Sequence, residues 1–421
     1  MIDLTLIREH TDVVRDAMRT LGATDAPVDQ ILALDARRRE LLVAVEALRA
    51  ERNRVSKQIP SIKDREIRDG LVTEMRQVAG RIDVLDAELG PLEQELQEAL
   101  LQMPNMPDAS VPVGADEREN VVVRQEGAIP DLAFVPQAHW DLGPALDIID
   151  FERGVKISGS RFYLLKGMGA RLQRALISYM LDVHTTQQDY VEVYPPYMVH
   201  RECLVGTAQL PKFADNIYVD QEDDLWFIST AEVPVTNMYR DEILDAAQLP
   251  VHHVAYTACF RREKMSAGRD TRGIKRGHQF DKVELVKFVE PSSSMDELEG
   301  LIRDAEAVLK GLELPYRVVQ MCTGDLSFSA AVKYDLEVWA AGCQEWLEVS
   351  SCSNFKDFQA RRANIRYRSE SGRPEYVHTL NGSGVALPRT LIAVIENYQT
   401  ADGHIVIPDV LRPYMGGIER I

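Results

Sequence analysis

Two long stretches of apolar residues at helical spacing, near the amino terminus, constrain the fold of this chain more than any other feature. In residues 31–59 and again in residues 67–103, apolar side chains recur at steps that sum to seven, which predicts two long helices with a coiled-coil seam. Arg38 and Arg52 occupy two positions of the first seam. The seam residues are Ile31, Leu34, Leu41, Val45, Leu48, Val55 and Ile59, followed by Ile67, Leu71, Val78, Ile82, Leu85, Leu89, Leu92, Leu96, Ala99 and Met103.

The break between the two stretches predicts that they fold back on each other. Pro60, Ser61 and Asp64 interrupt the pattern, so we expect an antiparallel α-helical coiled-coil hairpin over about residues 30–103. An arm of about 30 residues at 1.5 Å per residue reaches roughly 45 Å. Gly90 and Pro91 should kink the second helix. Spacing alone leaves open that such a hairpin is only a packing or dimerisation rod.

The charge of the hairpin favours a polyanion as its partner. The chain carries a formal net charge of -18, which argues against indiscriminate nucleic-acid binding and requires a local basic patch for any RNA contact. Basic residues prevail in residues 49–81 and acidic residues follow, which places the positive charge at the hairpin tip. The candidates for RNA contact are Arg49, Arg52, Arg54, Lys57, Lys63, Arg65, Arg68 and Arg76.

Composition is that of a folded protein in a reducing compartment. Of the 421 residues, 45% are hydrophobic and 27% charged, and no apolar run approaches the roughly 18 residues of a membrane span. The amino terminus has neither the basic nor the apolar region of a secretory signal. Five cysteines without a CxxC pair indicate free thiols. We therefore expect a cytoplasmic protein that does not enter a membrane.

A proline-containing segment, residues 103–107, ends the hairpin, and residues 111–116 form a linker. We predict an N-terminal domain of residues 1–107 and a second domain of residues 108–421. Strands are expected at 162–165, 191–194, 225–229, 283–289, 334–339 and 346–350, and helices at 170–187, 295–309 and 390–398. Several strands follow one another directly, which favours an α+β fold with a mostly antiparallel sheet flanked by helices over a doubly wound parallel sheet.

A basic string at residues 259–284 carries the clearest chemistry. Its pattern predicts a strand, a cationic glycine-containing loop and a returning strand, a hairpin that can place a guanidinium against phosphate. Arg261 is the candidate, because its fork geometry can hold a carboxylate and stabilise charge on phosphorus. The chain has no GxxxxGK[ST] loop and no GxGxxG after a strand, so an ATP enzyme of this sequence needs such another device.

This string resembles motif 2 of the class II aminoacyl-tRNA synthetases, in its seryl version. The resemblance implies that Arg261 and Arg262 belong to the ATP site, that Glu263 accepts from the adenine amino group, and that Phe280 stacks on the ring. Residues 264–266 also match the start of the KMSKS signature of class I synthetases. No HxGH partner exists in the chain, so we treat that match as coincidence.

Two further segments resemble the other motifs of the class. Residues 381–389 resemble motif 3, a glycine-rich turn before a helix, which implies that Arg389 lies across adenine and reaches the γ-phosphate. Residues 170–196 resemble motif 1, in which Pro196 matches the proline at the dimer interface. Asp189 departs from the glycine usual at that position. The resemblance implies a homodimer in which the arm of one protomer serves the active site of the other.

Two short strings, residues 230–232 and 348–362, resemble seryl-tRNA synthetases specifically. A pocket that rejects alanine must leave buried polar groups unsatisfied when the serine hydroxyl is missing, and carboxylates and hydroxyls suit that task. By resemblance, serine contacts Thr230, Ala231, Glu232, Arg261, Glu284, Asn381 and Ser383. The ATP site adds Glu348, Val349, Ser350 and Ser351, of which Glu348 and Ser351 would hold Mg²⁺. The cysteines lie in strings resembling the zinc-free bacterial type, so no zinc is expected.

The motifs follow the order of a bacterial-type seryl-tRNA synthetase, a resemblance that covers nearly the whole chain. It implies ATP-dependent activation of L-serine to seryl-adenylate and transfer of serine to tRNA(Ser), with tRNA(Sec) left open as a second acceptor. The hairpin would dock the long variable arm of the tRNA. The alternatives are a paralogue that serves a carrier protein, which would lack this basic hairpin, and a non-catalytic tRNA-binding relative. Against the latter stand Arg261, Glu263, Glu284, Glu348 and Arg389 together.

Deleting residues 31–103 should separate the two steps of the implied reaction. Serine-dependent exchange of pyrophosphate into ATP is expected to persist, because every residue assigned to serine or ATP lies outside the deletion. Charging of tRNA should fall by at least about a hundredfold through loss of the phosphate contacts. Both rates are measured on one preparation, and unchanged charging would contradict the role of the hairpin.

Overall fold

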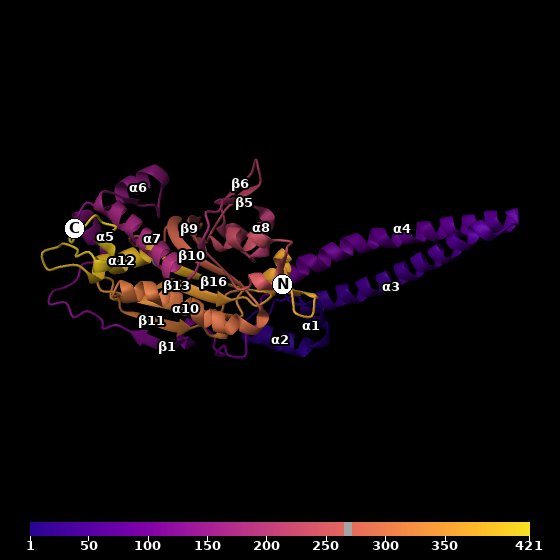
Figure 1. Cartoon of the computed structure of the whole chain (residues 1–421), viewed down its shortest axis with the longest axis horizontal. Helices are drawn as coiled ribbons and strands as arrows, with labels where there is room; N and C mark the ends of the chain where they lie inside the picture. Colours follow the sequence, from indigo (N-terminus) through magenta and orange to yellow (C-terminus); the bar gives the residue numbers. More distant parts are fainter. Residues whose placement is uncertain (265–271) are drawn as a thin grey trace. The chain divides into compact units, whose positions relative to one another are not determined.

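Figure 1 shows the computed structural model, which describes residues 1–264 and 272–421. The chain divides into two compact units, which we call the hairpin unit (Met1–Arg19 and Ala23–Pro104) and the core unit (Thr20–Gly22 and Asn105–Ile421). No helix in these described ranges is long and apolar enough to cross a membrane.

Two long helices pair along the hairpin unit, as the heptad pattern predicts (Figure 1). Its elements are α1 (Leu4–Glu9), α2 (Thr11–Thr20, whose last residue falls in the core unit), α3 (Val28–Gln58), the 3-10 turn η1 (Ile59–Ser61) and α4 (Arg65–Leu101). Asp64 caps α4 by accepting hydrogen bonds from the amides of Glu66 and Ile67, at 2.9 and 3.2 Å. The apolar cluster between α3 and α4 comprises Val45, Leu48, Val55, Met75, Val78 and Ile82.

Several positions of the hairpin differ from the predicted seam, among them Ile67, Met75 and Asp35. Ile67 is 57% exposed, because it lies in the first turn of α4, next to the tip. Met75, absent from the predicted seam, is buried. Asp35 is buried as well, and its carboxylate lies 3.6 Å from a guanidinium nitrogen of Arg8 and 3.1 Å from one of Arg39. These cations compensate the charge that burial would otherwise make costly.

The seam arginine Arg38 is half-buried and reaches the edge of the interface, where its Nε donates to Glu93 at 2.8 Å. Its aliphatic stem can thus cover the seam while the charged end stays paired. Helix α4 continues through Pro91 without a break in its assignment. The bend expected at that residue stays a prediction.

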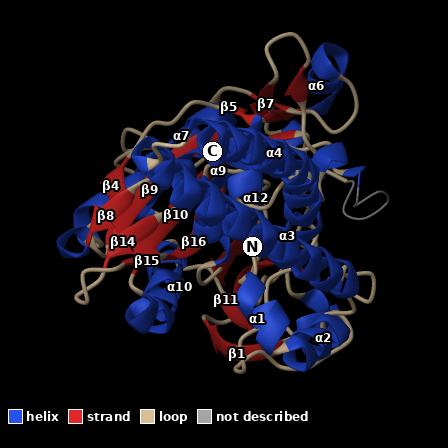
Figure 2. Cartoon of the chain, turned by 90° about the vertical axis from the view of Figure 1, so that its right-hand side faces the viewer, coloured by secondary structure: helices blue, strands red, loops and turns tan. Residues whose placement is uncertain are grey.

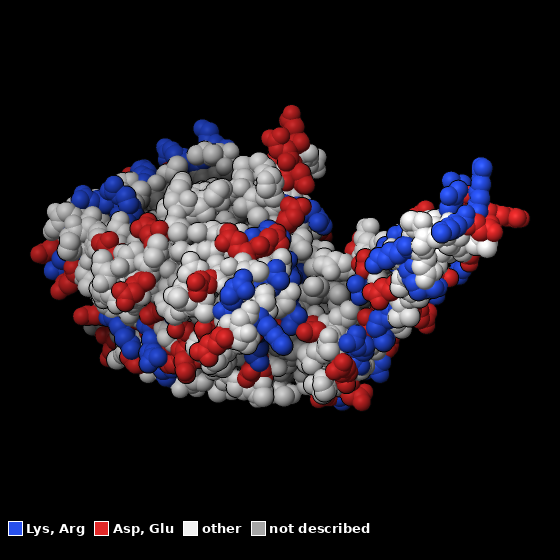
Figure 3. All heavy atoms as spheres, turned by 45° about the vertical axis from the view of Figure 1, so that its right-hand side comes forward, with Lys and Arg blue, Asp and Glu red and all other residues white. Residues whose placement is uncertain are grey.

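The residues predicted to contact RNA are exposed except Arg52, which is half-buried. Figure 3 shows lysine and arginine side chains on the surface among acidic ones. Arg49 pairs with Asp86 at 2.7 Å. For Arg65 and Arg68 the nearest carboxylate oxygens are 3.7 Å away, a distance at which exposed pairs contribute little. The cationic ends therefore face solvent, as binding to a polyanion would require.

A large, mostly antiparallel sheet organises the core unit and confirms the predicted α+β class. Within the described residues it has eight strands in the order β1-β11-β12-β13-β16-β10-β9-β4, and only the pairing of β4 with β9 is parallel. The strands are β1 (Val121–Glu126), β4 (Val191–Glu192), β9 (Val251–Phe260), β10 (Gln279–Val289), β11 (Tyr316–Gln320), β12 (Val332–Ala340), β13 (Glu345–Asn354) and β16 (His378–Ala386). Figure 2 shows β9, β10 and β16 side by side.

Helices and smaller sheets surround this large sheet. The helices are α5 (His139–Ala145), α6 (Phe151–Ser158), α7 (Met168–Gln187), α8 (Arg201–Gly206), α9 (Glu232–Thr236), α10 (Ser294–Gly311), α11 (Phe358–Ala363) and α12 (Leu387–Asn397). The short strands are β2 (Ile149–Asp150) with β3 (Leu164–Leu165), β5 (Met198–His200) with β6 (Val219–Asp220) and β7 (Leu225–Phe227), and β8 (Ile243–Asp245) with β14 (Arg366–Arg368) and β15 (Pro374–Tyr376).

The two faces of the large sheet pack against different helices. On β10, Val283 and Leu285 enter the main apolar core, which also takes residues of α7, α10 and α12. Val286 and Phe288 point to the opposite face and pack with residues of α9 and α11. Successive strand residues face opposite sides, so Glu284 lies on the α9 and α11 face. Helices α7, α10 and α12 cover the apolar face. The opposite face packs partly against α9 and α11 and also carries the polar residue Glu284.

The motif 3 segment is a strand where the sequence predicted a glycine-rich turn. Asn381 to Ala386 belong to β16 in the middle of the sheet, and all of them except Ala386 are buried. A Cβ on Gly382 would lie 2.9 Å from the Cys352 sulfur, and one on Gly384 would lie 2.4 Å from Nε2 of His184. These glycines therefore give room to side chains on the apolar face, and a strand through them satisfies the buried backbone.

Replacing Val45 by Ala should loosen the hairpin, because its side chain is fully buried between α3 and α4. Loss of the two methyl groups is expected to cost about 2 kcal/mol. Val43→Ala on the same helix is the matched control, since Val43 is 68% exposed and its loss should change stability by under about 0.5 kcal/mol. Amide hydrogen exchange of both helices in the whole chain measures the difference, and equal protection of the two variants would refute it.

Candidate active site

A cavity of about 340 Å³ in the core unit collects most of the residues predicted to bind substrate. Its size falls in the range of small-molecule sites. Strands β10, β12, β13 and β16 supply much of its wall together with the start of α12. The predicted residues that line it are Thr230, Glu232, Arg261, Glu263, Phe280, Glu284, Glu348, Val349, Ser351, Asn381, Ser383 and Arg389.

Strand alternation explains how β10 serves this cavity. Phe280, Lys282 and Glu284 occupy every second position of the strand, so their side chains project from one face. In the antiparallel register, Glu284 lies opposite Ser383 of β16, next to a β-bulge. Arg261 follows directly after β9, whose last residue pairs with the first residue of β10. Motifs 2 and 3 therefore meet across one pair of strands.

Two buried carboxylates share one amide at the inner end of the cavity. The side-chain nitrogen of Asn381 donates to Glu232 at 3.0 Å and to Glu284 at 2.9 Å. Gln359 donates to the other oxygen of Glu232 at 2.5 Å, and Lys282 lies 2.6 Å from Glu284. Burial, followed by the neighbouring charge of Glu284, raises the pKa of Glu232 to about 7. This end of the cavity is suited to a ligand that brings a positive charge and hydrogen-bond donors.

A cationic and aromatic wall lies beside the carboxylates. The Arg261 guanidinium carbon is 5.1 Å from the centre of the Phe280 ring, and its Nε donates to the Ser229 carbonyl at 3.2 Å. These contacts hold the side chain while its outer nitrogens remain on the cavity side. Glu263 lies 3.5 Å from a guanidinium nitrogen of Arg276. The wall can therefore receive an anion next to a flat apolar group.

Arg389 and Glu348 form the third part of the wall. Nη1 of Arg389 donates to the Glu348 carbonyl at 2.7 Å and lies 3.7 Å from its carboxylate. Desolvation opposes ionisation of Glu348, but Arg389, Lys333 and Arg261 outweigh it and lower the pKa of that carboxyl. Ser351 lies two residues beyond Val349 on β13 and faces Asp335 in the strand register. This wall therefore combines the side-chain oxygens of Glu348 and Ser351 with the positive charge of Arg389.

Three predicted residues do not line the cavity. Ala231 is fully buried in the apolar cluster under α9. Arg262 turns its guanidinium over the ring of Tyr218, 4.4 Å from its centre. Ser350 is buried and donates to the Ser383 carbonyl at 2.5 Å, on the side of β13 away from Ser351. Contact of these side chains with a ligand in this cavity would need a rearrangement.

The cavity also contains residues that the sequence analysis did not assign. They include Gln209, Phe213, Lys275, Arg276, Lys282, Phe328 and Lys333. Lys282 could have been found, because it alternates with Phe280 and Glu284 inside the motif 2 string. Gln209 and Phe328 follow no pattern that separates them from ordinary loop residues. Gln359 lies in a predicted string, but its contact with Glu232 depends on how α11 packs.

Part of the motif 2 loop lies outside the described residues. Residues 265–271 belong to this part, so the conformation around Lys264 and Met265 stays untested. The arm that returns from the loop is described from Arg272 onward. Its residues Lys275 and Arg276 line the cavity.

The raised pKa of Glu232 should make stability depend on pH. A glutamate in an unfolded chain titrates near 4.5, so between that value and about 7 the folded protein binds more protons. This stabilising contribution is complete below the unfolded pKa and is lost as pH rises through 7. The free energy of unfolding should therefore decline across this window by up to about 3 kcal/mol.

Glu232→Gln, which cannot ionise, is expected to flatten that decline. Denaturant midpoints of the wild type and the variant are compared at several pH values between about 5 and 8. Glu152→Gln on the exposed surface of α6 is the control and should follow the wild type. Parallel curves for the wild type and Glu232→Gln would contradict the assignment.

Comparison with known proteins agrees with the motifs in both units. Residues 1–107 match the family model of the seryl-tRNA synthetase N-terminal domain, and residues 214–398 match that of the tRNA synthetase class II core domain (G, H, P, S and T). The serine–tRNA ligase of Thermomicrobium roseum is 62% identical over 422 aligned positions, which cover 100% of this chain and 95% of that protein. The serine–tRNA ligase of Herpetosiphon aurantiacus is 57% identical with full coverage of both chains.

Solved structures show the same relationship. The crystal structure of seryl-tRNA synthetase from Pyrococcus horikoshii complexed with ATP superposes with a TM-score of 0.94 at 40% identity, over 100% of this chain and 99% of that one. Full-length identity of this degree, together with both domain matches, shows common descent and a common activity. The chain therefore belongs to the seryl-tRNA synthetase family of class II aminoacyl-tRNA synthetases and is a serine–tRNA ligase.

Proposed function

We propose that both steps of serine–tRNA ligation take place in the cavity lined by Arg261, Glu284 and Arg389. The observation that carries this proposal is the joining of three chemistries in one site: two carboxylates at the inner end, an arginine beside an aromatic ring, and a second arginine at the start of α12. In the first step, the serine carboxylate attacks the α-phosphorus of ATP and pyrophosphate leaves. In the second, the terminal ribose hydroxyl of the tRNA attacks the adenylate carbonyl and AMP leaves.

The carboxylate end of the cavity is the proposed serine site. The ammonium group of serine would lie between Glu232 and Glu284, which are already held at hydrogen-bonding distance from Asn381. Thr230 and Ser383 are the hydroxyls available to the serine side chain, and Ser383 lies 3.4 Å from Glu284. Alanine would leave these buried groups without their partner, which is the physical basis for rejecting it. Ala231, buried beneath the site, would contribute only through its backbone.

The arginine and aromatic wall is the proposed ATP site. Arg261 would bridge the serine carboxylate and the α-phosphate, because its guanidinium lies over the Phe280 ring and its charge also acts on Glu232. Phe280 offers a face for adenine, and Glu263 an acceptor for its amino group. Arg389 would bind the outer phosphates and Val349 would pack beside them. The P. horikoshii relative was crystallised with ATP, which supports ATP as a ligand of this chain.

The predicted Mg²⁺ ion would be held by Glu348 and Ser351. Hard oxygen donors of this kind are what a magnesium site requires, and Asp335 adds a carboxylate oxygen without a hydrogen-bond partner in the described part of the chain. The residues present therefore fit the ion, which when bound would neutralise charge on the ATP phosphates. The prediction that no zinc takes part rests on the spacing of the cysteines.

The hairpin is the proposed docking surface for tRNA(Ser), whose long variable arm would contact the basic tip by shape and phosphate charge. The same mode of recognition would extend to tRNA(Sec) if that tRNA presents a similar arm. We further propose that the functional domains divide at residues 107/108 and that motif 1, α7 with residues 189–196, joins two protomers. Free cysteines in the described chain fit the predicted cytoplasmic location.

Pyrophosphate exchange across the twenty amino acids tests the proposal. Serine alone should give a signal, and Arg261→Ala should lower kcat/KM for this exchange at least about a hundredfold, because the charge that develops at phosphorus loses its partner. Arg317→Ala in the same unit is the control, since that guanidinium contacts Glu337 and Trp346 and lies outside the cavity lining. Near-normal exchange in Arg261→Ala would refute the assigned role.

A further inference from the structure

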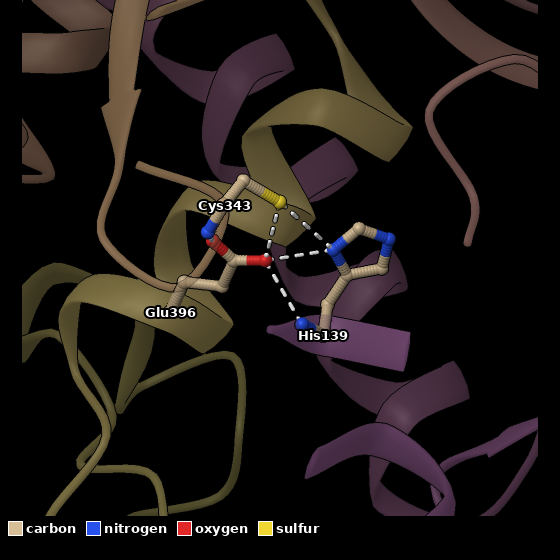
Figure 4. Close-up of side chains that lie close together, drawn as sticks. All are labelled: His139, Cys343 and Glu396. Carbon is tan, nitrogen blue, oxygen red and sulfur yellow. Dashed lines mark hydrogen bonds and ion pairs between the residues drawn. The ribbon is translucent and has the colours of Figure 1, made fainter. Parts of the chain in front are cut away.

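A buried cluster outside the residues assigned above joins three distant parts of the core unit. His139 begins α5, Cys343 lies in the turn between β12 and β13, and Glu396 lies near the end of α12 (Figure 4). Potential ligand atoms of the three residues lie within 4.8 Å of one another, and the side chains of His139 and Glu396 are fully buried. Such a group could hold a metal ion or could be a hydrogen-bonded link.

The hydrogen bonds favour a link. One carboxylate oxygen of Glu396 accepts from the His139 amide at 2.9 Å, from His139 Nδ1 at 2.7 Å and from the Cys343 thiol at 3.1 Å. The other oxygen accepts from the Cys343 amide at 2.9 Å. Burial opposes ionisation of Glu396, but the His139 side chain, the His139 amide and the Cys343 thiol outweigh it and lower the pKa of that carboxyl. The carboxylate is satisfied without an ion.

The second ring nitrogen of His139 determines where its proton lies. Nε2 is 3.1 Å from the amide nitrogen of Ile274, and an amide can only donate. Nε2 therefore accepts, and in the neutral imidazole the proton is on Nδ1, which donates to Glu396. The ring thus joins a carboxylate on α12 to the backbone of residues 272–276, which we call the return arm of the motif 2 loop.

The neighbours of His139 hold the same arm. The Arg272 guanidinium lies 4.5 Å from the centre of the Trp140 ring and 3.7 Å from the Asp141 carboxylate. Gly273 has a φ of 73°, and a Cβ at this position would lie 1.9 Å from Nε2 of His139. A side chain there would therefore force the arm away from the ring.

The return arm leads directly into the ATP side of the cavity. Lys275 and Arg276 line the cavity, and Arg276 lies 3.5 Å from Glu263. The Lys275 carbonyl accepts a bond of 3.5 Å from Nε of Arg389, on the same helix as Glu396. We propose that His139 is a positioning residue for ATP binding: it holds the return arm so that Arg276 faces the nucleotide. This inference rests on the proposed placement of ATP.

Two substitutions of His139 each remove one of the two hydrogen bonds that its ring makes, to Glu396 and from the Ile274 amide. In His139→Asn the amide nitrogen replaces Nδ1 and still donates to Glu396, but nothing reaches the Ile274 amide. This variant leaves one buried amide without its acceptor and should melt lower, while its KM for ATP rises about tenfold and its KM for serine stays unchanged. In His139→Gln the longer amide can accept from Ile274 but leaves Glu396 without the donor that the His139 ring supplied. That variant should melt lower while KM for ATP stays within about twofold.

Gly273→Ala tests the same contact from the arm, leaves the bonds to Glu396 in place, and should reproduce the rise in KM for ATP. Tyr316→Phe is the matched control, because it removes one buried hydrogen bond, 3.0 Å to Glu306, away from the cavity. It should lower stability without changing either KM.

Pyrophosphate exchange by the wild-type enzyme distinguishes failure of the proposed function from failure of the positioning role alone. Absence of serine-dependent pyrophosphate exchange in the wild type would overturn the proposed function itself. An active wild type with an unchanged KM for ATP in His139→Asn and Gly273→Ala would overturn only the positioning role. A stoichiometric metal in the purified protein, lost in Cys343→Ala, would also overturn it, because an ion on Nδ1 replaces the proton that the link requires.

Discussion

The antiparallel pairing of β10 with β16 is the interaction on which the candidate active site of this chain depends. It places Glu284 opposite Ser383 in the middle of the large sheet, with a bulge between Val283 and Glu284 that adjusts the register. Both strands are buried, so neither can slip without moving apolar residues out of the core. The two segments that carry the synthetase motifs are therefore held together by backbone hydrogen bonds rather than by the ligand.

The same pairing explains the glycines of motif 3. Gly382 and Gly384 alternate with Asn381 and Ser383, so they face the apolar side of the sheet while the polar residues face the cavity. On the apolar side, Nε2 of His184 lies 2.9 Å from the Gly384 carbonyl. Helix α7, the proposed dimer helix, thus contacts the back of the strand that carries the proposed serine residues. One face of β16 thus packs against helices, and the other face presents the proposed serine-binding residues to the cavity.

Buried charge is the main energetic cost of this site. Glu232 and Glu284 share Asn381 as a donor, and Lys282 supplies one positive charge at 2.6 Å from Glu284. A second cation would stabilise the pair further, and in the proposed function the ammonium of serine supplies it. The raised pKa of Glu232 expresses the same imbalance in the empty cavity. An arrangement that is strained without substrate can gain more when substrate arrives.

The sequence by itself determined the hairpin, the α+β class and the membership of the family. A heptad seam reports local helix geometry, so α3 and α4 followed from spacing, with errors only at positions such as Ile67 and Asp35. Motif strings likewise predicted Arg261, Glu284 and Arg389 as site residues, and all three line the cavity, since their spacing within a strand or at a helix start is local information.

Only the tertiary structure decided which of these side chains reach the cavity. Ser350 and Ser351 are adjacent in the sequence but face opposite sides of β13, and Arg262 packs on Tyr218 while Arg261 lines the cavity. The link from Glu396 through His139 to Ile274 joins residues far apart in the chain. No periodicity records such contacts, because they arise from strand register, helix packing and the burial of polar groups that must find partners.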